Sequence, residues 1–506
     1  MEERDSTTSN QDKRLEVVGQ IAERSQKLLT NLVANPKGFG NGKADPLSLA
    51  PIMHALMSRL IANPTSLIDS QFSLWQNYIE LWQNTSKKLL GHDVEPVIKP
   101  EQDDRRFRDA AWDDDAIFDV IKQSYLLTSR WMMQFVDGID DLDDKTRQKI
   151  DFYTRQFVDV MAPSNFVATN PEVLRATLSS GGDNLLRGFN HLLDDLNRGQ
   201  GKLAIKMTDP DAFEVGVNLA TTPGKVVFQN DLMQLIQYEP STTKVYKQPL
   251  LIIPPWINKY YILDLRAKNS FIKFAVDQGL TVFVISWVNP DERYAEKTFE
   301  DYMLEGPLAA LDAIEQATGE TEINAIGYCL GGTLLSSTLA YMAAKRDKRI
   351  KATTFFTALT DFENPGDLGV FIDEDQLAAM DEMMAEQGFL DGREMATTFN
   401  TLRANDLIWS FVINNYLLGK EPFPFDLLYW NSDSTRMPCA MHSFYLRKFY
   451  HENKLVEPGG VTLCGVPIDL KKVRTPTYML STKEDHIAPW MSTYAATQLF
   501  RGKTTF

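Results

Sequence analysis

Cysteine, positive charge and long apolar runs are all scarce in this sequence of 506 residues. Three cysteines are too few for a disulfide framework, which excludes the small disulfide-bonded secreted class. Lys and Arg number 52 against 68 Asp and Glu, and the resulting net charge of −16 disfavours binding to a phosphate backbone. No apolar run approaches the roughly 18 residues of a membrane-spanning helix. We therefore expect no nucleic-acid partner and no transmembrane segment.

The opening of the chain also lacks a targeting signal. Residues 1–14 are polar and contain no apolar stretch of the kind that a secretory signal peptide needs. We therefore expect a cytoplasmic chain, in which thiols stay reduced. Its 43% hydrophobic and 24% charged residues are typical of a globular protein with two or three domains.

Residues 1–205 predict a mostly helical domain with a disordered start. Apolar residues recur at helical spacing within 68–82, 113–136, 146–161 and 170–178. For the aromatic stripe that includes Trp75 and Trp82, we favour core packing over a ligand groove, although it could also dock a second subunit. The acidic run at 137–144 lacks the spacing of a calcium-binding loop.

Residues 206–506 predict an α/β domain, because short strands now alternate with helices. We expect strands at 225–229, 232–238, 249–253, 280–287, 323–326, 352–358, 475–480 and 503–506, and helices at 262–278 and 299–318. This alternation predicts a parallel sheet covered by helices on both faces. The aromatic-rich residues 361–470 interrupt it, and we expect them to form a cap.

Cys329 lies between a predicted strand and a predicted helix, in Gly327-Tyr-Cys-Leu-Gly331. Glycines around a reactive residue let a sharp turn approach the neighbouring backbone, which is typical of a nucleophile elbow. Serine is the usual residue at this place, and here a thiol replaces it. Cys329 is therefore the candidate nucleophile, with a buried structural cysteine as the alternative.

An elbow nucleophile needs two backbone N–H donors to stabilise the oxyanion of its intermediate. The N–H of Leu330, directly after the nucleophile, is the first candidate. The second should come from the loop after the strand at 249–253, around Trp256.

The acid and the base of such a site should follow later strands. Asp485, after the strand at 475–480, is the candidate acid that orients the base, and Glu484 is a weaker choice. The base should follow the next strand, but none of the six histidines lies there. His486 adjoins Asp485 in sequence, which favours a structural role for it.

Several longer motifs together resemble one enzyme family. They are Gly-Tyr-Cys-Leu-Gly-Gly-Thr at 327–333, Pro-Pro-Trp-Ile-Asn-Lys-Tyr-Tyr-Ile-Leu-Asp-Leu at 254–265, Asp-Leu-Leu-Tyr-Trp-Asn at 426–431, Glu-Asp-His-Ile-Ala-Pro-Trp at 484–490, Asp-Arg-Arg-Phe at 104–107 and the run at 163–172. On these motifs the chain resembles the class I poly(3-hydroxyalkanoate) synthases along nearly its whole length.

The resemblance implies an α/β-hydrolase fold with a cap insertion, preceded by a mostly helical N-terminal domain. It implies a cytoplasmic acyltransferase on polyester granules, often a homodimer, that polymerises (R)-3-hydroxyacyl-CoA. Short-chain substrates, above all 3-hydroxybutyryl-CoA, and an acyl intermediate on Cys329 are expected. No metal and no separate cofactor is expected, because CoA is part of the substrate and a product. Phe425 and Trp430 are guesses at the pocket wall, with cap core as the equal alternative.

The family's base histidine lies in a Gly-His segment that the printed sequence does not reach. Because general-base help is worth about 10²–10⁴ in rate, we expect the 506-residue chain as printed to be nearly inactive. Two other functions stay open: a Cys-dependent hydrolase of the dienelactone-hydrolase or thioesterase type, and a non-catalytic granule-associated protein.

Overall fold

Two compact units make up the part of the chain that the computed structural model describes, residues 64–139 and 142–506. One unit holds the described residues up to Asp209 together with Arg403–Phe423, and the other holds Pro210–Leu402 and Pro424–Phe506. The expected disordered start of the chain lies outside the described residues. The sequence-based division assigned 403–423 to the cap, whereas the structure groups them with the helical unit.

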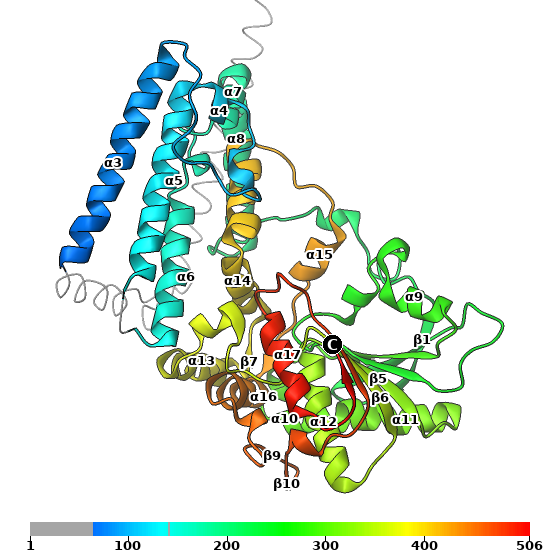
Figure 1. Cartoon of the computed structure of the whole chain (residues 1–506). Coiled ribbons are helices and arrows are strands. Elements are labelled where there is room, and N and C mark those ends of the chain that lie inside the picture. Colours follow the sequence, from blue (N-terminus) through cyan, green and yellow to red (C-terminus); the bar gives the residue numbers. More distant parts are fainter. Residues whose placement is uncertain (1–63, 140–141) are drawn as a thin grey trace, which may run out of the picture. The chain divides into compact units, whose positions relative to one another are not determined.

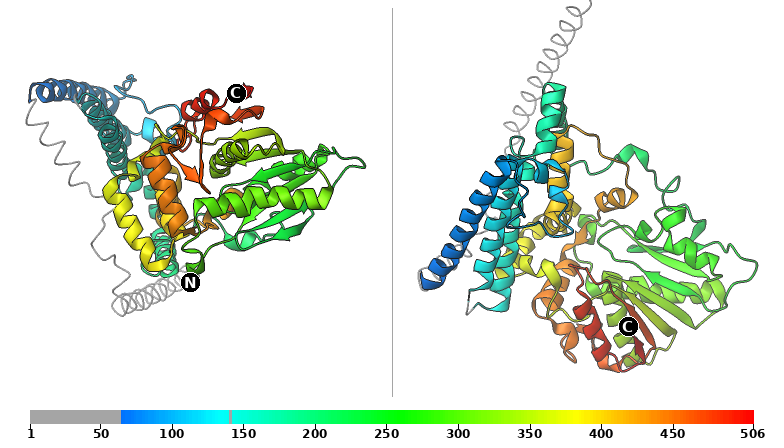
Figure 2. Two further views of the ribbon diagram at one scale, coloured as in Figure 1. Left: turned by 90° about the horizontal axis from the view of Figure 1, so that it is seen from below. Right: turned by 45° about the horizontal axis from the view of Figure 1, so that its top comes forward.

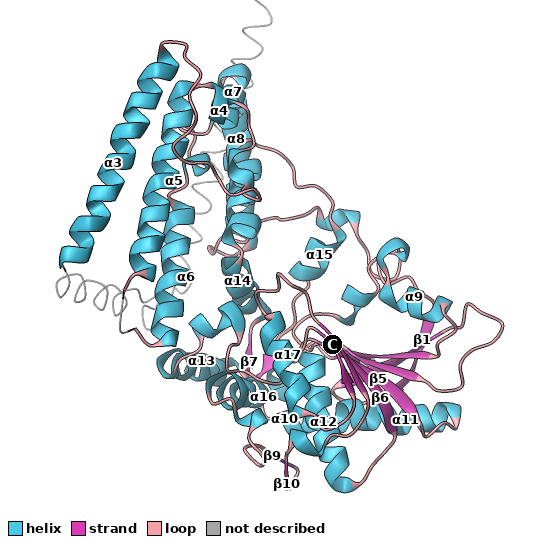
Figure 3. Ribbon diagram, in the orientation of Figure 1, coloured by secondary structure: helices cyan, strands magenta, loops and turns pink. Residues whose placement is uncertain are grey.

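The described residues of the first unit form helices and loops, without strands (Figure 3). Asp115 caps the longest of its central helices by accepting hydrogen bonds from the N–H groups of Ile117 and Phe118. All four predicted helices occur. The helices are α3 (Pro64–Leu89), α4 (Ala111–Asp114), α5 (Ala116–Asp137), α6 (Asp144–Val160), α7 (Pro171–Ser180) and α8 (Asp183–Arg198).

The exposure of the aromatic stripe on α3 contradicts the prediction that this stripe packs in the core. Leu81 is 1% exposed and packs with Tyr78 against Leu127 of α5. The side chains of Phe72, Trp75, Ile79 and Trp82 are instead 51–68% exposed. Spacing alone could not decide between the two apolar faces of this helix, because the partner that buries one of them is set by tertiary packing.

Residues Arg403–Phe423 complete the first unit by packing on α8. The Tyr416 hydroxyl donates to Asp195 Oδ2 at 2.6 Å, and Asn184 Nδ2 donates to the carbonyl of Leu417 at 2.7 Å. Tyr416 lies 221 residues from Asp195 in the chain. A separation of that size is why a local pattern could not assign this segment.

An eight-stranded sheet forms the centre of the second unit (Figure 1). The predicted strands all occur, but the parallel expectation is wrong for the first two. β1 and β2 pair antiparallel through a short turn, and β2 runs antiparallel to β4. In spatial order the strands are β1 (Gly224–Gln229), β2 (Met233–Tyr238), β4 (Val282–Trp287), β3 (Leu250–Ile253), β5 (Ile323–Tyr328), β6 (Ile350–Phe356), β11 (Thr477–Leu480) and β12 (Thr504–Thr505).

Helices cover both faces of this sheet, as expected (Figure 2). Alternate strand side chains point to opposite faces, so Leu251 and Ile252 belong to different apolar layers. The layer of Leu251 packs on α11 (Ala309–Thr318) and α12 (Leu330–Lys345), and the other packs on α9 (Phe271–Asp277).

Both predicted helices of the α/β half are interrupted. Residues 262–278 are α-helical only in α9, because the buried Asp264 carboxylate accepts from Ser270 Oγ at 2.5 Å and fixes a turn before the helix. Residues 299–318 divide into α10 (Phe299–Met303), a π-helical turn (Leu304–Leu308) and α11. The turn contains Pro307, which lacks the N–H that a regular helix needs.

The insertion after β6 is mainly helical. Within the second unit it contains α13 (Glu374–Gln387), α14 (Gly392–Leu402), α15 (Asp426–Ser432), α16 (Cys439–Tyr445) and a π-helical turn (Leu446–His451). Two short strand pairs accompany them, β7 (Phe389–Leu390) with β8 (Met437–Pro438) and β9 (Thr462–Leu463) with β10 (Val466–Pro467). Helix α17 (Trp490–Leu499) follows β11.

Candidate active site

Cys329 occupies a strained turn between β5 and α12. Its backbone has φ 51° and ψ −121°, a combination that residues other than glycine rarely adopt. The Cys329 N–H donates to the carbonyl of Phe356 at 2.9 Å, so the end of β6 holds the turn in place. Backbone strain that the surrounding structure maintains is typical of functional positions. This is the geometry of a nucleophile elbow.

Two glycines permit the close packing of the elbow. A Cβ on Gly331 would lie 2.0 Å from the carbonyl oxygen of Ile253, and one on Gly327 would lie 2.5 Å from the Cα of Gly332. No larger side chain fits these places without displacing backbone. The packing brings the start of α12 against the end of β3, so the loop after β3 adjoins the elbow.

The thiol of Cys329 is held in its neutral form. Burial of the sulfur raises the pKa of Cys329 to about 11, the N–H of Leu330 beside it acts in the opposite direction, and the charge of Asp485 raises it further. The thiolate is the reactive form of cysteine. A proton acceptor is therefore needed before this sulfur can act as a nucleophile near pH 7.

Asp485 lies in the loop between β11 and α17. Its Oδ1 accepts hydrogen bonds from the N–H groups of Ile487 and Ala488, both at 2.9 Å, which orients the carboxylate. The charge of Asp485 reaches Cys329 and Tyr328, since it raises the pKa of both. Glu484 is exposed. His486 lies next to Asp485, and its carbonyl accepts from the N–H of Asp367 at 2.9 Å.

The loop after β3 is anchored from two sides. Trp287 Nε1 donates to the carbonyl of Pro254 at 2.9 Å, and the hydroxyl of Thr435 donates to the carbonyl of Trp256 at 2.7 Å. The Trp256 ring is 1% exposed and packs edge-on against Phe299 and Tyr445. Its side chain therefore belongs to the core, while its main chain lies beside the elbow.

Two tyrosines from the insertion belong to the apolar cluster against which Cys329 packs, and the sequence analysis missed them. Tyr445 of α16 and Tyr450 of the following π-helical turn are hydrogen-bonded to each other. Burial raises the pKa of both phenols, and Cys329 contributes to both shifts. Their ring centroids are 5.4 Å apart. The aromatic content of the insertion indicated an apolar cap, but it did not indicate which of its rings belong to the cluster around Cys329.

Comparisons with known proteins agree with the fold. A family model of the alpha/beta hydrolase fold matches residues 249–506, and that of the poly-beta-hydroxybutyrate polymerase (PhaC) N-terminus matches residues 103–275. A poly(3-hydroxyalkanoate) polymerase from Methylorubrum extorquens is 52% identical over 88% of this chain and 74% of that protein. The poly(3-hydroxyalkanoate) polymerase subunits PhaC from Rhizobium meliloti and Cupriavidus necator are 49% and 41% identical, over 92% of this chain in each case and 76% and 78% of those proteins. The chain belongs to the poly(3-hydroxyalkanoate) polymerase family.

In this polymerase-family chain the two residues guessed for the pocket wall lie on or beside α15. Trp430 Nε1 donates to the carbonyl of Lys259 at 2.7 Å, and the ring packs with Tyr261 and Leu265. That apolar cluster is separate from the one against which Cys329 packs. Phe425 directly precedes α15 and is 40% exposed. A role in the pocket wall stays a prediction for both.

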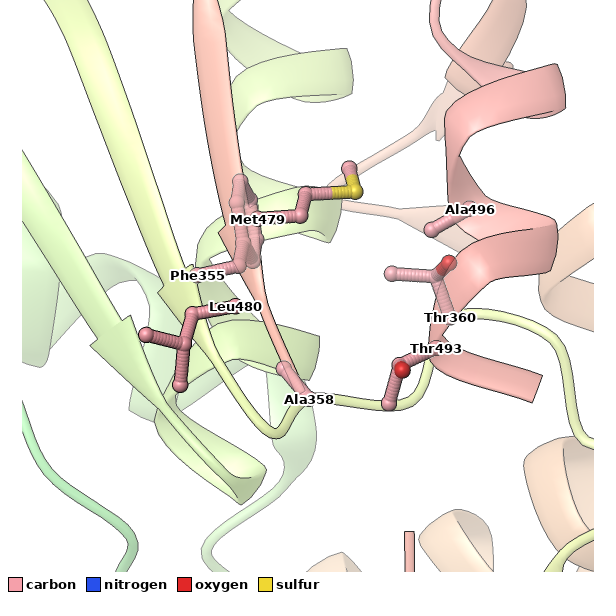
Figure 4. Close-up of a pocket in the computed structure, with 7 residues that line it drawn as sticks. All are labelled: Phe355, Ala358, Thr360, Met479, Leu480, Thr493 and Ala496. Carbon is pink, nitrogen blue, oxygen red and sulfur yellow. The ribbon is translucent and has the colours of Figure 1, made fainter. Parts of the chain in front are cut away.

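A small hollow lies between β6, β11 and α17 (Figure 4). It has no room for a water molecule, and the Met479 side chain reaches across it toward Ala496 and Thr360. The Thr360 hydroxyl is buried and has no hydrogen-bond partner among the described residues. The lining residues Phe355 and Ala358 also pack against Gly332, so the hollow adjoins the helix that carries the elbow.

Residues 64–139 and 142–506 contain neither a metal-binding cluster nor a membrane-spanning helix. No group of three or more His, Cys, Asp or Glu side chains in this part of the chain could hold a metal ion. None of its helices is long and apolar enough to cross a membrane.

Proposed function

We propose that this chain transfers a 3-hydroxyacyl group from CoA to Cys329 and then to the end of a growing poly(3-hydroxyalkanoate), with release of CoA. The observation that carries the proposal is the strained elbow, with Cys329 at its tip, the Leu330 N–H beside the sulfur and Asp485 within electrostatic reach. The names of the relatives support the polymer class. The name of the matching N-terminal model supports 3-hydroxybutyryl-CoA as the substrate.

The first step exchanges one thioester for another. The sulfur of Cys329 attacks the carbonyl carbon, the negative charge on the carbonyl oxygen is stabilised by the N–H of Leu330 and by the loop around Trp256, and the bond to the CoA sulfur breaks. The proton of Cys329 leaves with CoA. With a thiol pKa of about 11, only about 10⁻⁴ of the sulfur is thiolate near pH 7, so a base must take this proton. We assign Asp485 to orient that base.

The second step uses the energy that the thioester retains. The terminal 3-hydroxyl of the growing polymer attacks the acyl carbon on Cys329, a C–O bond forms, the C–S bond breaks and the hydroxyl proton returns to the sulfur. Water would compete as a nucleophile and release a free hydroxy acid. The buried Tyr445 and Tyr450, which belong to the apolar cluster against which Cys329 packs, support the exclusion of water from this step.

We extend the proposal to assembly on a polyester surface as a homodimer. The exposed apolar side chains of α3, among them Trp75 and Trp82, support an apolar contact of this kind. Sedimentation of the chain with purified polyester particles, and its mass in solution by light scattering, test the two parts separately.

Mass spectrometry of the intact chain after exposure to 3-hydroxybutyryl-CoA tests the chemistry, because one turnover suffices. We expect a hydroxybutyryl adduct that a Cys329→Ala variant lacks, equimolar release of CoA, and longer oligomers with time. Free 3-hydroxybutyrate without oligomers would instead indicate a hydrolase. Absence of any adduct would support a granule-associated protein without catalysis.

A further inference from the structure

Thr435, in the insertion, is joined to the loop after β3 by three hydrogen bonds. Its single hydroxyl hydrogen is shared between two carbonyl oxygens, that of Trp256 at 2.7 Å and that of Ile257. Its N–H donates to the same Ile257 carbonyl at 2.9 Å. Asn258 and Ser434 form an antiparallel bridge next to these contacts. The side chain of Thr435 is almost fully enclosed, since the residue is only 1% exposed.

These contacts determine where the N–H groups of the loop point. The described chain contains no cis peptide bond, and in a trans peptide the C=O and the N–H point in opposite directions. Because Thr435 holds the carbonyl of Trp256, the N–H of Ile257 in the same peptide must face away from Thr435. A rotation of that peptide would break the hydrogen bond to the buried hydroxyl.

The rest of the loop leaves few other donors. Pro254 and Pro255 have no N–H, and Trp287 holds the carbonyl of Pro254. Within residues 64–139 and 142–506, the N–H groups of Trp256 and Ile257 donate to no other group. Buried N–H groups are almost always paired, so unpaired ones in the loop that adjoins the elbow are suited to a developing negative charge.

We propose that Thr435 is a positioning residue that aims the N–H of Ile257 at the acyl oxygen during attack by Cys329. The inference rests on the proposed function and deepens it, because it assigns the second oxyanion donor to Ile257 and its orientation to a side chain of the insertion. Thr435 touches neither substrate nor sulfur in this assignment. It acts through the Trp256–Ile257 peptide.

Two substitutions at Thr435 separate the hydroxyl from the shape of the side chain. Thr435→Val keeps the shape and removes the donor, while Thr435→Ser keeps the donor. Thr338→Val is the matched control, because Thr338 is equally buried and its hydroxyl donates to the carbonyl of Leu334 within α12. All three are compared with the unsubstituted chain by thermal unfolding.

The readout is the ratio of two reactions of Cys329, both followed by intact mass. Acylation by 3-hydroxybutyryl-CoA passes through an oxyanion, whereas alkylation by iodoacetamide does not. We expect Thr435→Val to slow acylation by about 10-fold to 10³-fold with alkylation unchanged, and we expect Thr435→Ser to stay close to the parent. Thr338→Val should leave both rates unchanged. Equal acylation in Thr435→Val and the parent, or a parallel loss of both reactions, would overturn the inference.

A second acyl donor, 4-nitrophenyl acetate, keeps this test independent of CoA recognition. If it acylates Cys329 with the expected sensitivity to Thr435→Val while the CoA thioester does not react, the proposed function fails and the inference stands. If neither donor acylates the parent chain while iodoacetamide does, there is no oxyanion site to position, and the inference fails as well.

Discussion

At the scale of single residues, the reactivity of Cys329 depends on charges around its sulfur. Burial and the carboxylate of Asp485 both raise the pKa of this thiol, whereas the N–H of Leu330 lowers it. The same burial that excludes water therefore suppresses the thiolate. A chain of this kind gains nucleophilic power mainly by removal of the proton during attack, not by a resting thiolate.

Asp485→Asn provides a direct test of this electrostatic link. Removing the negative charge should lower the pKa of Cys329, so more thiolate is present at pH 8 and alkylation by iodoacetamide should quicken by up to about tenfold. Acyl transfer should fall, because the base loses its orienting partner. The exposed neighbour Glu484 supplies the control, Glu484→Gln, for which neither rate should change. Slower alkylation of Asp485→Asn would contradict the link.

His442 of α16 should make the fold sensitive to acid. Burial lowers its pKa from 6.5 to about 4, and neither ring nitrogen has a hydrogen-bond partner among the described residues. The unfolded chain binds this proton more readily than the folded one. The contribution of neutral His442 to the free energy of unfolding is therefore fully retained above pH 6.5. It is lost as the pH falls toward 4, and the loss is roughly 2 kcal/mol at pH 5.

Urea unfolding at pH 7.5 and pH 5 measures this contribution. His442→Leu should lose less stability than the parent between the two values, by about that amount, whereas the exposed His92→Gln should behave as the parent does. An identical pH dependence of His442→Leu and the parent would show that His442 is not buried in its neutral form.

At the scale of elements, the elbow depends on how closely α12 approaches β3. Gly331→Ala would place a methyl group 2.0 Å from the carbonyl oxygen of Ile253, and the atoms that it would meet are all backbone. We expect a loss of about 1–3 kcal/mol or more in the free energy of unfolding, together with slower acylation of Cys329, because strand and helix must separate. Ser337→Ala, farther along α12, should cost less than Gly331→Ala and keep the acylation rate. Parent-like stability of Gly331→Ala would refute this packing.

At the scale of the whole molecule, a segment inside the α/β half completes the helical unit. Asp195 of α8 is 2% exposed and accepts from Tyr416, from Arg198 and from the N–H of Lys206 at 3.0 Å. The insertion after β6 therefore serves two units. Residues 403–423 pack on α8, while Thr435 contacts the loop after β3 and Tyr445 belongs to the cluster against which Cys329 packs.

Tyr416→Phe tests the first of these roles. It removes one hydrogen bond to a buried carboxylate, which should cost about 1.5–3 kcal/mol. Hydrogen exchange should quicken in α8 and in 403–423 and stay unchanged in the central strands β3 and β5. Equal quickening in the strands would mean that the two units open together.

The sequence by itself determined the elements of the sheet and the turn that carries Cys329, the candidate nucleophile. Strand and helix periods, together with the glycines around Cys329, are local patterns, and they predicted the strands of the sheet and the elbow correctly. Helix continuity was less predictable. Pro307 interrupts one helix because it lacks an N–H, and the hydrogen bond from Ser270 to Asp264 fixes a turn that interrupts the other.

Only the tertiary structure decided which residues surround Cys329. Thr435 lies 179 residues from Trp256 in the chain, and the insertion supplies Tyr445 and Tyr450 to the apolar cluster against which Cys329 packs. It also decided which face of α3 is buried and that 403–423 belong with α8. Local periodicity reports which side of an element is apolar. The partner that meets it is selected by packing and hydrogen bonding between residues far apart in the chain.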